Sequence, residues 1–189
     1  MGSMVSLPIS SLWQKKEYRI LIAGPFYSGK TTILFSQLKN YGPIETVPTV
    51  AFNVESLTHG GMNFVCWDIG GRHTLRPEWG VYIAQTNAII FVVDSTDIRL
   101  DDAANELTNL LNLECMRQLS DAPLLVFANK QDLKGAKSPV EIAEALHLRE
   151  LGDRIWNIAP CSATDGVGIS GGMDWLVQAL KSQRKSQRA

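Results

Sequence analysis

Cysteine, net charge and long apolar runs are all scarce in this sequence, and each scarcity excludes a class of protein. The three cysteines in 189 residues (Cys66, Cys115 and Cys161) are widely spaced and fit neither a disulfide framework nor a metal-ligand pattern. The formal net charge of −1 argues against a nucleic-acid binder. No apolar run approaches the roughly 20 residues that span a bilayer, and the N-terminus lacks the basic and apolar regions of a secretory signal. We therefore expect a cytosolic protein whose membrane contact is at most peripheral.

The sequence does contain enough apolar material, 45% of its residues, for the core of one ordinary domain. Continuous apolar runs at 88–94 (AIIFVVD) and 123–130 (PLLVFANK) are typical of strands buried on both faces of a parallel sheet. Two further strand-like runs, 49–57 and 62–68, predict an antiparallel hairpin joined by a Gly-Gly turn. The other predicted elements are a strand at 17–24, a strand before Cys161, and helices at 29–40, 101–117, 138–146 and 169–181. This alternation predicts an α/β doubly wound sheet, whose ligands bind at the carboxyl ends of the strands.

A phosphate-binding loop is predicted at residues 24–31, where GPFYSGKT fits the pattern GxxxxGKS/T between a strand and a helix. Backbone N–H groups and the helix N-terminus would hold the phosphates. Lys30 would reach the β- and γ-phosphates, and the Thr31 hydroxyl would bind Mg²⁺. The alternative is a chance glycine turn, and the motif alone does not identify the base. The predicted nucleotide contacts are Gly24, Ser28, Gly29, Lys30, Thr31 and Thr32.

A base-recognition segment, NKQD at 129–132, directly follows a predicted buried strand. The Asp132 carboxylate can accept from N1–H and the exocyclic amine of guanine, a pair of donors that adenine does not present. The Lys130 stem can lie along the base while Asn129 ties this loop to the phosphate loop. Ser162 and Ala163 follow a further strand, and the Ala163 N–H can donate to guanine O6. Alone, NKQD could be a polar turn, but its order after the phosphate loop and WDIGG, and before SAT, indicates guanine.

Over essentially its whole length the sequence resembles the Arf and Arf-like family of small GTPases. The stretches that carry the resemblance are GKTTIL (29–34), VPTVAFNVE (47–55), WDIGG (67–71), LRPEW…Y (75–82), FVVDSTD (91–97), VFANKQDL (126–133) and GGMDWL (171–176). The combination of PTxxFNVE with WDxGG and NKQD separates this family from Ras-, Rab- and Rho-like relatives. The resemblance implies a P-loop small-GTPase fold: a mostly parallel six-stranded sheet with one antiparallel edge pair and helices on both faces.

The resemblance also implies a switch that binds GTP or GDP with Mg²⁺. Thr49 would bind the metal in the GTP state, Asp68 would hold it through water, and the Gly71 N–H would sense the γ-phosphate. Loss of that phosphate would release the two segments that carry Thr49 and Gly71. In this family the hairpin, residues 54–66 here, slides in register and expels the N-terminal helix.

The partners implied by the resemblance are a guanine-nucleotide exchange factor, a GTPase-activating protein and effector proteins, with no nucleic acid. Phe52, Trp67 and Tyr82 resemble the aromatic triad that recognises effectors, although such residues are equally typical of a core. The implied role is effector recruitment in vesicle trafficking. The expected location is the cytoplasm, reversibly on Golgi or other endomembranes.

The chain divides in this interpretation into an N-terminal segment at 1–16, a GTPase domain at 17–182 and a basic tail at 183–189. Gly2 lies in an MGSMVS sequence that fits the N-myristoylation pattern, with a cloning remnant as the alternative. The apolar and basic residues that follow could form an amphipathic anchor, although Pro8 restricts where a helix can begin. Peripheral membrane contact is therefore expected through the N-terminus.

The candidate catalytic residues are Lys30, Gly71 and Arg72. The sequence departs from the family at two places in this catalytic region. Arg72 stands where these GTPases carry the glutamine that orients water, and a guanidinium has donors only. Pro25, Phe26 and Tyr27 replace small residues in the phosphate loop and would crowd an inserted activating arginine. We therefore expect slow hydrolysis, with a GTP-binding docking scaffold of little or no hydrolysis as the alternative. A P-loop kinase is set aside, because it would leave NKQD unexplained.

Overall fold

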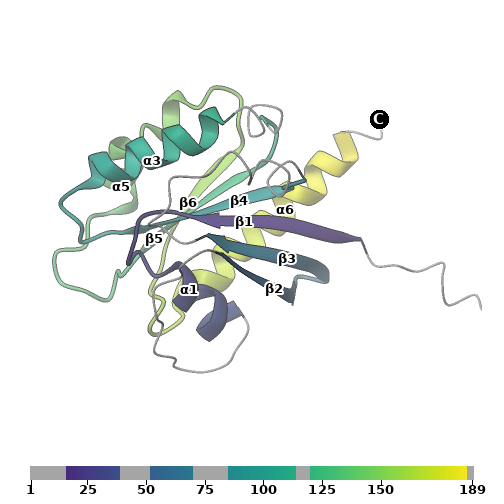
Figure 1. Cartoon of the computed structure of the whole chain (residues 1–189), viewed down its shortest axis with the longest axis horizontal. Helices are drawn as coiled ribbons and strands as arrows, with labels where there is room; N and C mark the ends of the chain where they lie inside the picture. Colours follow the sequence, from purple (N-terminus) through teal and green to yellow (C-terminus); the bar gives the residue numbers. More distant parts are fainter. Residues whose placement is uncertain (1–15, 39–51, 70–84, 114–119, 187–189) are drawn as a thin grey trace, which may run out of the picture.

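One six-stranded sheet organises the molecule, with the strand order β2-β3-β1-β4-β5-β6 (Figure 1). The computed structural model describes residues 16–38, 52–69, 85–113 and 120–186. The strands are β1 (Glu17–Ala23), β2 (Phe52–His59), β3 (Met62–Ile69), β4 (Ala88–Asp94), β5 (Leu124–Asn129) and β6 (Trp156–Pro160). Edge strand β2 pairs antiparallel with β3, and every other neighbouring pair is parallel. The predicted mostly parallel sheet with one antiparallel edge pair is confirmed.

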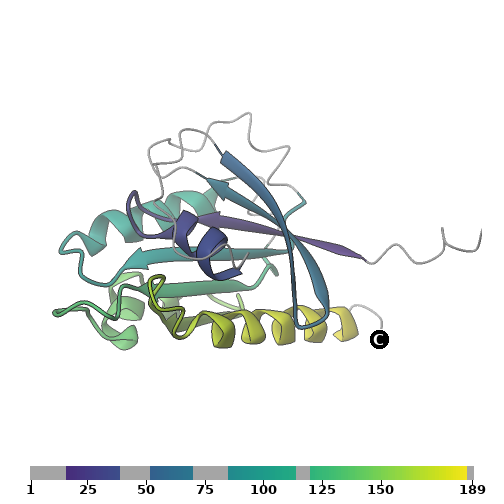
Figure 2. The same cartoon turned by 90° about the horizontal axis from the view of Figure 1, so that it is seen from below.

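Both faces of the sheet are covered, because β4 and β5 carry apolar side chains on each face and all of β5 is buried. On one face lie α1 (Lys30–Thr32), the π-helical stretch η2 (Ile33–Leu38) and α6 (Ile169–Ser186). On the other lie α3 (Leu100–Asn112), α5 (Pro139–Ala145) and the short 3₁₀ helix η4 (Leu148–Glu150) (Figures 1 and 2). Each face has its own apolar core. The continuous apolar runs in the sequence therefore do mark strands buried on both sides.

Several helix boundaries differ from those predicted. The first helix changes from α to π geometry after Thr32, and α3 ends at Asn112 instead of continuing to Arg117, because Leu113 takes extended backbone angles. The last helix runs five residues beyond Lys181, into the segment predicted as a basic tail. Ser138 caps α5 in a reciprocal pair with Glu141, which explains why that boundary is sharp. Among the described residues, none of the helices is long and apolar enough to cross a membrane.

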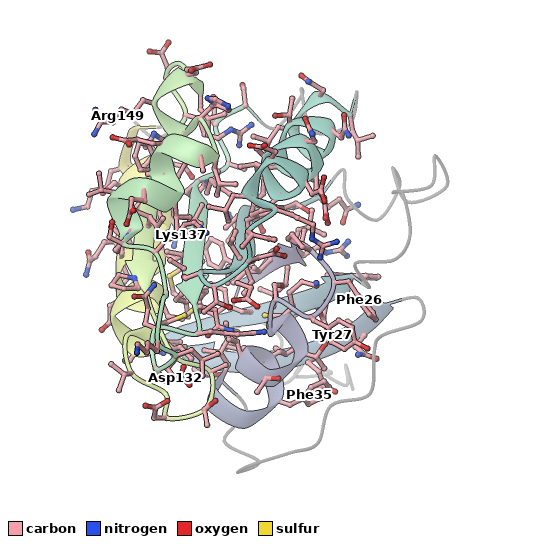
Figure 3. The ribbon with its side chains drawn as sticks, turned by 90° about the vertical axis from the view of Figure 1, so that its left-hand side faces the viewer. Phe26, Tyr27, Phe35, Asp132, Lys137 and Arg149 are labelled. Atoms are coloured by element: carbon pink, nitrogen blue, oxygen red, sulfur yellow. The ribbon has the colours of Figure 1, made fainter. Side chains whose placement is uncertain are left out.

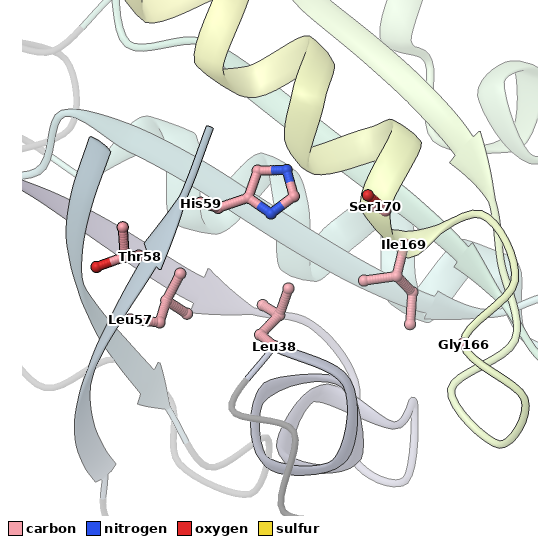
Figure 4. A pocket seen from close by; sticks show the side chains of 7 residues that line it. All are labelled: Leu38, Leu57, Thr58, His59, Gly166, Ile169 and Ser170. Carbon is pink, nitrogen blue, oxygen red and sulfur yellow. The ribbon is translucent and has the colours of Figure 1, made fainter. Parts of the chain in front are cut away.

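The β2–β3 hairpin extends beyond the sheet and rests on α6 (Figure 2). Its turn is Gly60-Gly61, with φ angles of 55° and 76° that favour glycine. At the tip His59 Nε2 lies 2.8 Å from Asp174 Oδ1, and Lys181 Nζ donates to the Gly60 carbonyl at 3.5 Å. A pocket of about 210 Å³ lies where the hairpin, η2 and the start of α6 meet, with Leu38, Leu57 and Ile169 along it (Figure 4).

Candidate nucleotide site

Polar residues follow the carboxyl ends of neighbouring strands at one edge of the sheet. The phosphate loop follows β1, and Asp68 lies near the end of β3. Asp94 ends β4 directly opposite Asn129, which ends β5. Ser162 and Ala163 come shortly after β6. Parallel strands place these ends together, as expected for a ligand site of a doubly wound sheet.

Two glycines of the phosphate loop have positive φ angles and no room for a side chain. Gly24 has φ 133°, and a Cβ there would overlap the carbonyl oxygen of Val92 in β4. Gly29 has φ 99° and stands at the N-cap of α1, where a Cβ would overlap the side-chain amide of Asn129. Glycine is therefore required at both positions for backbone conformation and for close approach.

Lys30 is buried, with 6% of its surface exposed, and its ammonium lies within the phosphate loop. Its Nζ donates to the carbonyl oxygens of Gly24 at 2.6 Å and Pro25 at 2.8 Å. Burial lowers the pKa of Lys30, while the charges of Asp68 and Glu106 act in the opposite direction. Burial likewise raises the pKa of Glu106 against the opposing charge of Lys30. The ammonium is thus held by groups that a bound phosphate could replace.

Thr31 and Asp68 form an oxygen pair beside Lys30. The Thr31 hydroxyl donates to Asp68 Oδ2 at 2.7 Å, and Asp68 is fully buried. A hydroxyl and a carboxylate are hard oxygen donors and suit Mg²⁺, which usually combines one or two protein ligands with water and substrate phosphates. Within the described ranges no group of three or more His, Cys, Asp or Glu side chains could hold a metal. The chemistry of this pair therefore fits the ion predicted from the sequence.

Asn129 joins the phosphate loop to the loop after β6. Its Nδ2 donates to the Ser28 carbonyl at 2.8 Å, and its Oδ1 accepts from the Ala163 N–H at 2.9 Å. The amide is 1% exposed, and the Cys161 thiol lies 3.6 Å from the same Oδ1. The Ala163 N–H, predicted to meet guanine O6, is directed in this structure at Asn129. Asn129 therefore fixes the position of the phosphate loop relative to the loop after β6.

Lys130 and Asp132 lie at the rim of the same site. Lys130 has a φ of 66°, and its Nζ lies 2.6 Å from Asp94 Oδ2. The Asp132 side chain is exposed, near the lower end of the molecule in Figure 3. The next loop is closed by a bond between the Ser162 hydroxyl and Asp165.

Sequence reasoning missed the contribution of Asp94. This residue ends a continuous apolar strand, as Asn129 does, and that shared position was the signal that could have identified it. Ser95, Gln131 and Lys137 were also missed, although they link the loops after β4 and β5. Their roles depend on tertiary contacts that no motif encodes.

The aromatic residues of the phosphate loop pack against each other. The rings of Phe26 and Tyr27 have centroids 4.0 Å apart in an edge-on arrangement (Figure 3). Tyr27 is 70% exposed and has a φ of 62°, whereas Phe26 is partly buried. Tyr27 therefore points outward from the loop, whereas Phe26 does so only in part.

Several predicted site residues lie outside the described residues. These are Gly2, Thr49, Gly71, Arg72 and Tyr82. Of the remaining aromatic triad, Phe52 begins β2, and Trp67 is partly buried against the core under α3. The described part of the site therefore consists of its phosphate, metal and base regions.

Comparisons with known proteins agree on one family. The model of the ADP-ribosylation factor family matches residues 5–180. ADP-ribosylation factor-like protein 1 of Saccharomyces cerevisiae is 46% identical over 186 residues, which cover 97% of this chain and 100% of the yeast protein. The Arl6 (BBS3) small GTPase of Trypanosoma brucei, solved with the bound nucleotide analogue GppNp, is 34% identical with a TM-score of 0.77. That alignment covers 89% of this chain and 99% of the other.

Proposed function

The chain belongs to the ADP-ribosylation factor family of small GTPases, and from this premise we propose that it is a GTP/GDP switch that recruits effectors to endomembranes in vesicle trafficking. Members of the family are GTPases that bind guanine nucleotides. The expected regulators are an exchange factor and an activating protein. The GTPase domain would span residues 17–182, with the N-terminal segment before it and the basic segment 183–189, whose first residues continue α6, after it.

The observation that carries the proposal is the pair of bonds made by Asn129. One amide side chain reaches the phosphate loop at Ser28 and the loop after β6 at Ala163. Asp132 and Lys130 follow it at once in the chain, so the groups suited to a guanine edge and face are attached to the phosphate loop. This arrangement supports a guanosine nucleotide, whose base and phosphates are read together.

Mg²⁺ would be held by the Thr31 hydroxyl and, through water, by Asp68, with Thr49 added in the GTP state. The bound ion would neutralise charge on the β- and γ-phosphates. Lys30 would leave the Gly24 and Pro25 carbonyls for the phosphates, and the Gly71 N–H would report the γ-phosphate. Because the Thr31–Asp68 pair is already assembled, little rearrangement is needed on the metal side.

We further propose that hydrolysis is slow because Arg72 cannot accept a hydrogen bond from the attacking water. The second candidate function, a docking scaffold with little or no hydrolysis, is favoured by the same residue. The aromatic pair Phe26–Tyr27 supports an altered response to activating proteins, since Tyr27 projects from the loop that an inserted arginine would approach.

The test is single-turnover hydrolysis of preloaded GTP with Mg²⁺ and no partner protein, comparing the wild type with Arg72→Gln. The exposed Arg149→Gln in η4 is the matched control for loss of a positive charge (Figure 3). A variant at least about tenfold faster than wild type, a difference of about 1.4 kcal/mol in barrier, would support lost water positioning. Equal and measurable rates would reject that explanation, and no hydrolysis in either protein would favour the scaffold.

Membrane recruitment would depend on Gly2 and the apolar residues that follow it. A single myristoyl chain gives only marginal binding, on the order of 10⁴ M⁻¹, so a second apolar contact is required. Flotation with liposomes should recover the GTP-loaded protein when it has been myristoylated during expression. The Gly2→Ala variant, prepared in the same way, should not be recovered with the liposomes. Equal recovery of both would reject lipidation at Gly2 as the anchor.

A further inference from the structure

Asp94 holds Lys130 in one position within the base loop, residues 129–132. Its two carboxylate oxygens have different partners: Oδ1 accepts from the N–H and hydroxyl of Thr96 at 2.9 and 2.7 Å, and Oδ2 accepts from Lys130 Nζ at 2.6 Å. The side chains of Lys130 and Asp94 are only 30% and 20% exposed. This pair is therefore more fixed than an ordinary surface ion pair, whose partners move independently.

The other end of the Lys130 side chain is fixed by its backbone. With φ at 66°, Lys130 occupies the left-handed region that non-glycine residues rarely adopt. The backbone thus sets the direction in which the stem leaves the loop, and Asp94 fixes where the ammonium ends. A flexible four-carbon chain anchored at both ends presents one apolar flank instead of many.

The loops that carry the two residues are also bonded to each other. The Ser95 N–H donates to the Asn129 carbonyl at 2.9 Å, and Gln131 Nε2 donates to the Ser95 hydroxyl at 2.8 Å. The Lys137 N–H donates to the Ser95 carbonyl at 2.9 Å. The loop after β4 is therefore hydrogen-bonded to the base loop. Asp94, which ends β4, contacts Lys130, the residue predicted to lie along the base.

We propose that Asp94 is a positioning residue for guanine nucleotide binding, which acts by holding the Lys130 stem against the place of the base. The inference rests on the guanine site proposed above. Immobilising a rotamer-rich side chain costs binding free energy when it happens during association. Here the immobilisation is complete beforehand, so loss of Asp94 should weaken retention of the nucleotide without changing which base edge is read.

The experiment measures release of fluorescent mant-GDP from the full chain with Mg²⁺ after addition of excess GDP. Asp94→Asn keeps the shape of the side chain and removes its charge, and we expect release to become about five to ten times faster. Asp101→Asn, an exposed carboxylate in the first turn of α3, is the matched control and should stay within about twofold of wild type.

A double-mutant cycle separates positioning from a structural role. Lys130→Met keeps an unbranched stem without the ammonium, and in that background Asp94→Asn should change release by less than about twofold. The same acceleration in both backgrounds would overturn the proposal, because Asp94 would then act independently of Lys130. Release from Asp94→Asn within twofold of wild type would also overturn it.

Thr96→Val provides a second variant that retains the carboxylate. It removes one of the bonds that orient Asp94, so release should be about two to three times faster, again only when Lys130 is present. Should Asp94→Asn fail to fold by circular dichroism, this variant decides the question alone. A wild-type protein that retains no mant-GDP would reject the guanine site itself, whereas a wild type that binds with an unresponsive cycle rejects only the role of Asp94.

Discussion

The base region and the β2–β3 hairpin are attached to the rest of the molecule by different kinds of contact. In the base region Asn129, 1% exposed, makes bonds of 2.8 and 2.9 Å to two other loops. At the hairpin tip His59 and Asp174 form a 2.8 Å pair whose side chains are 21% and 65% exposed, and Lys181 reaches Gly60 only at 3.5 Å. The first set is buried and directional, and the second can be replaced by water.

The difference shows where this fold places rigidity. A buried polar group that loses its partner costs about 1–3 kcal/mol, whereas an exposed ion pair contributes about 0–1 kcal/mol. The part of the sheet that would hold the base is therefore expensive to open. The hairpin is held at its tip by contacts whose loss costs little free energy. Four experiments test this contrast, from the largest expected effect to the smallest.

The largest expected difference concerns the buried thiols. Burial, with a smaller contribution from the charge of Asp132, raises the pKa of Cys161 from 9.0 to about 12. At pH 8 the folded protein should therefore hold about a thousandfold less Cys161 thiolate than the unfolded chain, and alkylation by iodoacetamide should be slower by a similar factor. Because the folded pKa is the higher one, the stability that this thiol contributes is present below pH 9.0 and is lost as the pH rises toward about 12.

Cys66 in β3 provides the comparison within the same molecule, in a Cys115→Ser background. Although it is buried too, we expect it to be alkylated faster than Cys161, because opening of the hairpin strands exposes it. Mass spectrometry of peptides after timed labelling measures both rates. Equal rates would show that the hairpin strands open no more readily than the base region.

The next effect is on the buried amide. Asn129→Ala should lower the free energy of unfolding by about 3 kcal/mol, since the Ser28 carbonyl and the Ala163 N–H both lose their partner. Urea unfolding without added nucleotide measures it, so that no change in nucleotide affinity enters the free energy. Gln131→Ala in the same loop, which loses more exposed bonds to Ser95 and Lys137, is the control and should cost about 1 kcal/mol. Equal losses would contradict the special position of Asn129.

A smaller effect is expected from the two glycines of the hairpin turn. Both have positive φ angles, so alanine at either position should cost about 1 kcal/mol in backbone strain. At Gly60 a Cβ would also lie 3.1 Å from two methyl carbons of Val177, whereas at Gly61 no described atom lies within 4 Å. We expect Gly60→Ala to be destabilised by about 1 kcal/mol more than Gly61→Ala in the same urea experiment. Equal losses would mean that the turn does not press on α6.

The smallest effect belongs to the exposed pair at the tip. Asp174→Asn should lower the free energy of unfolding by under about 0.5 kcal/mol. It should nevertheless speed amide hydrogen exchange at Gly60 and Gly61, because local opening requires less free energy than global unfolding. A loss above about 1.5 kcal/mol would place this contact in the same class as Asn129 and would remove the contrast between the two regions.

Much of the fold could be predicted because local and global signals agree in β4 and β5. Their apolar runs required burial on both faces, and the polar residues at their ends then had to meet at one edge. The end of α3 and the π geometry after Thr32 could not be predicted, because helical periodicity continues past Asn112 and does not distinguish α from π turns. Local pattern specifies an element better than its boundary.

The contacts within the site were predictable to different degrees. A loop-bridging role for Asn129 followed from its place in NKQD, and the structure contains that bridge. The pairing of Asp94 with Lys130 was not predictable, since it depends on the register that places Asp94 opposite Asn129. The use of the Ala163 N–H by Asn129 was also missed, because it depends on the tertiary contact that brings the loop after β6 beside Asn129.

The orientation of the Asn129 amide has one more consequence. Its nitrogen donates to the Ser28 carbonyl and its oxygen accepts from the Ala163 N–H, so a half-turn about the terminal bond would set oxygen against oxygen and N–H against N–H. Neither bond can then be exchanged for the other or kept in a rotated state. The phosphate loop and the loop after β6 must therefore form their contacts with Asn129 together and lose them together. Nucleotide release should accordingly be cooperative and follow a single exponential, not two phases.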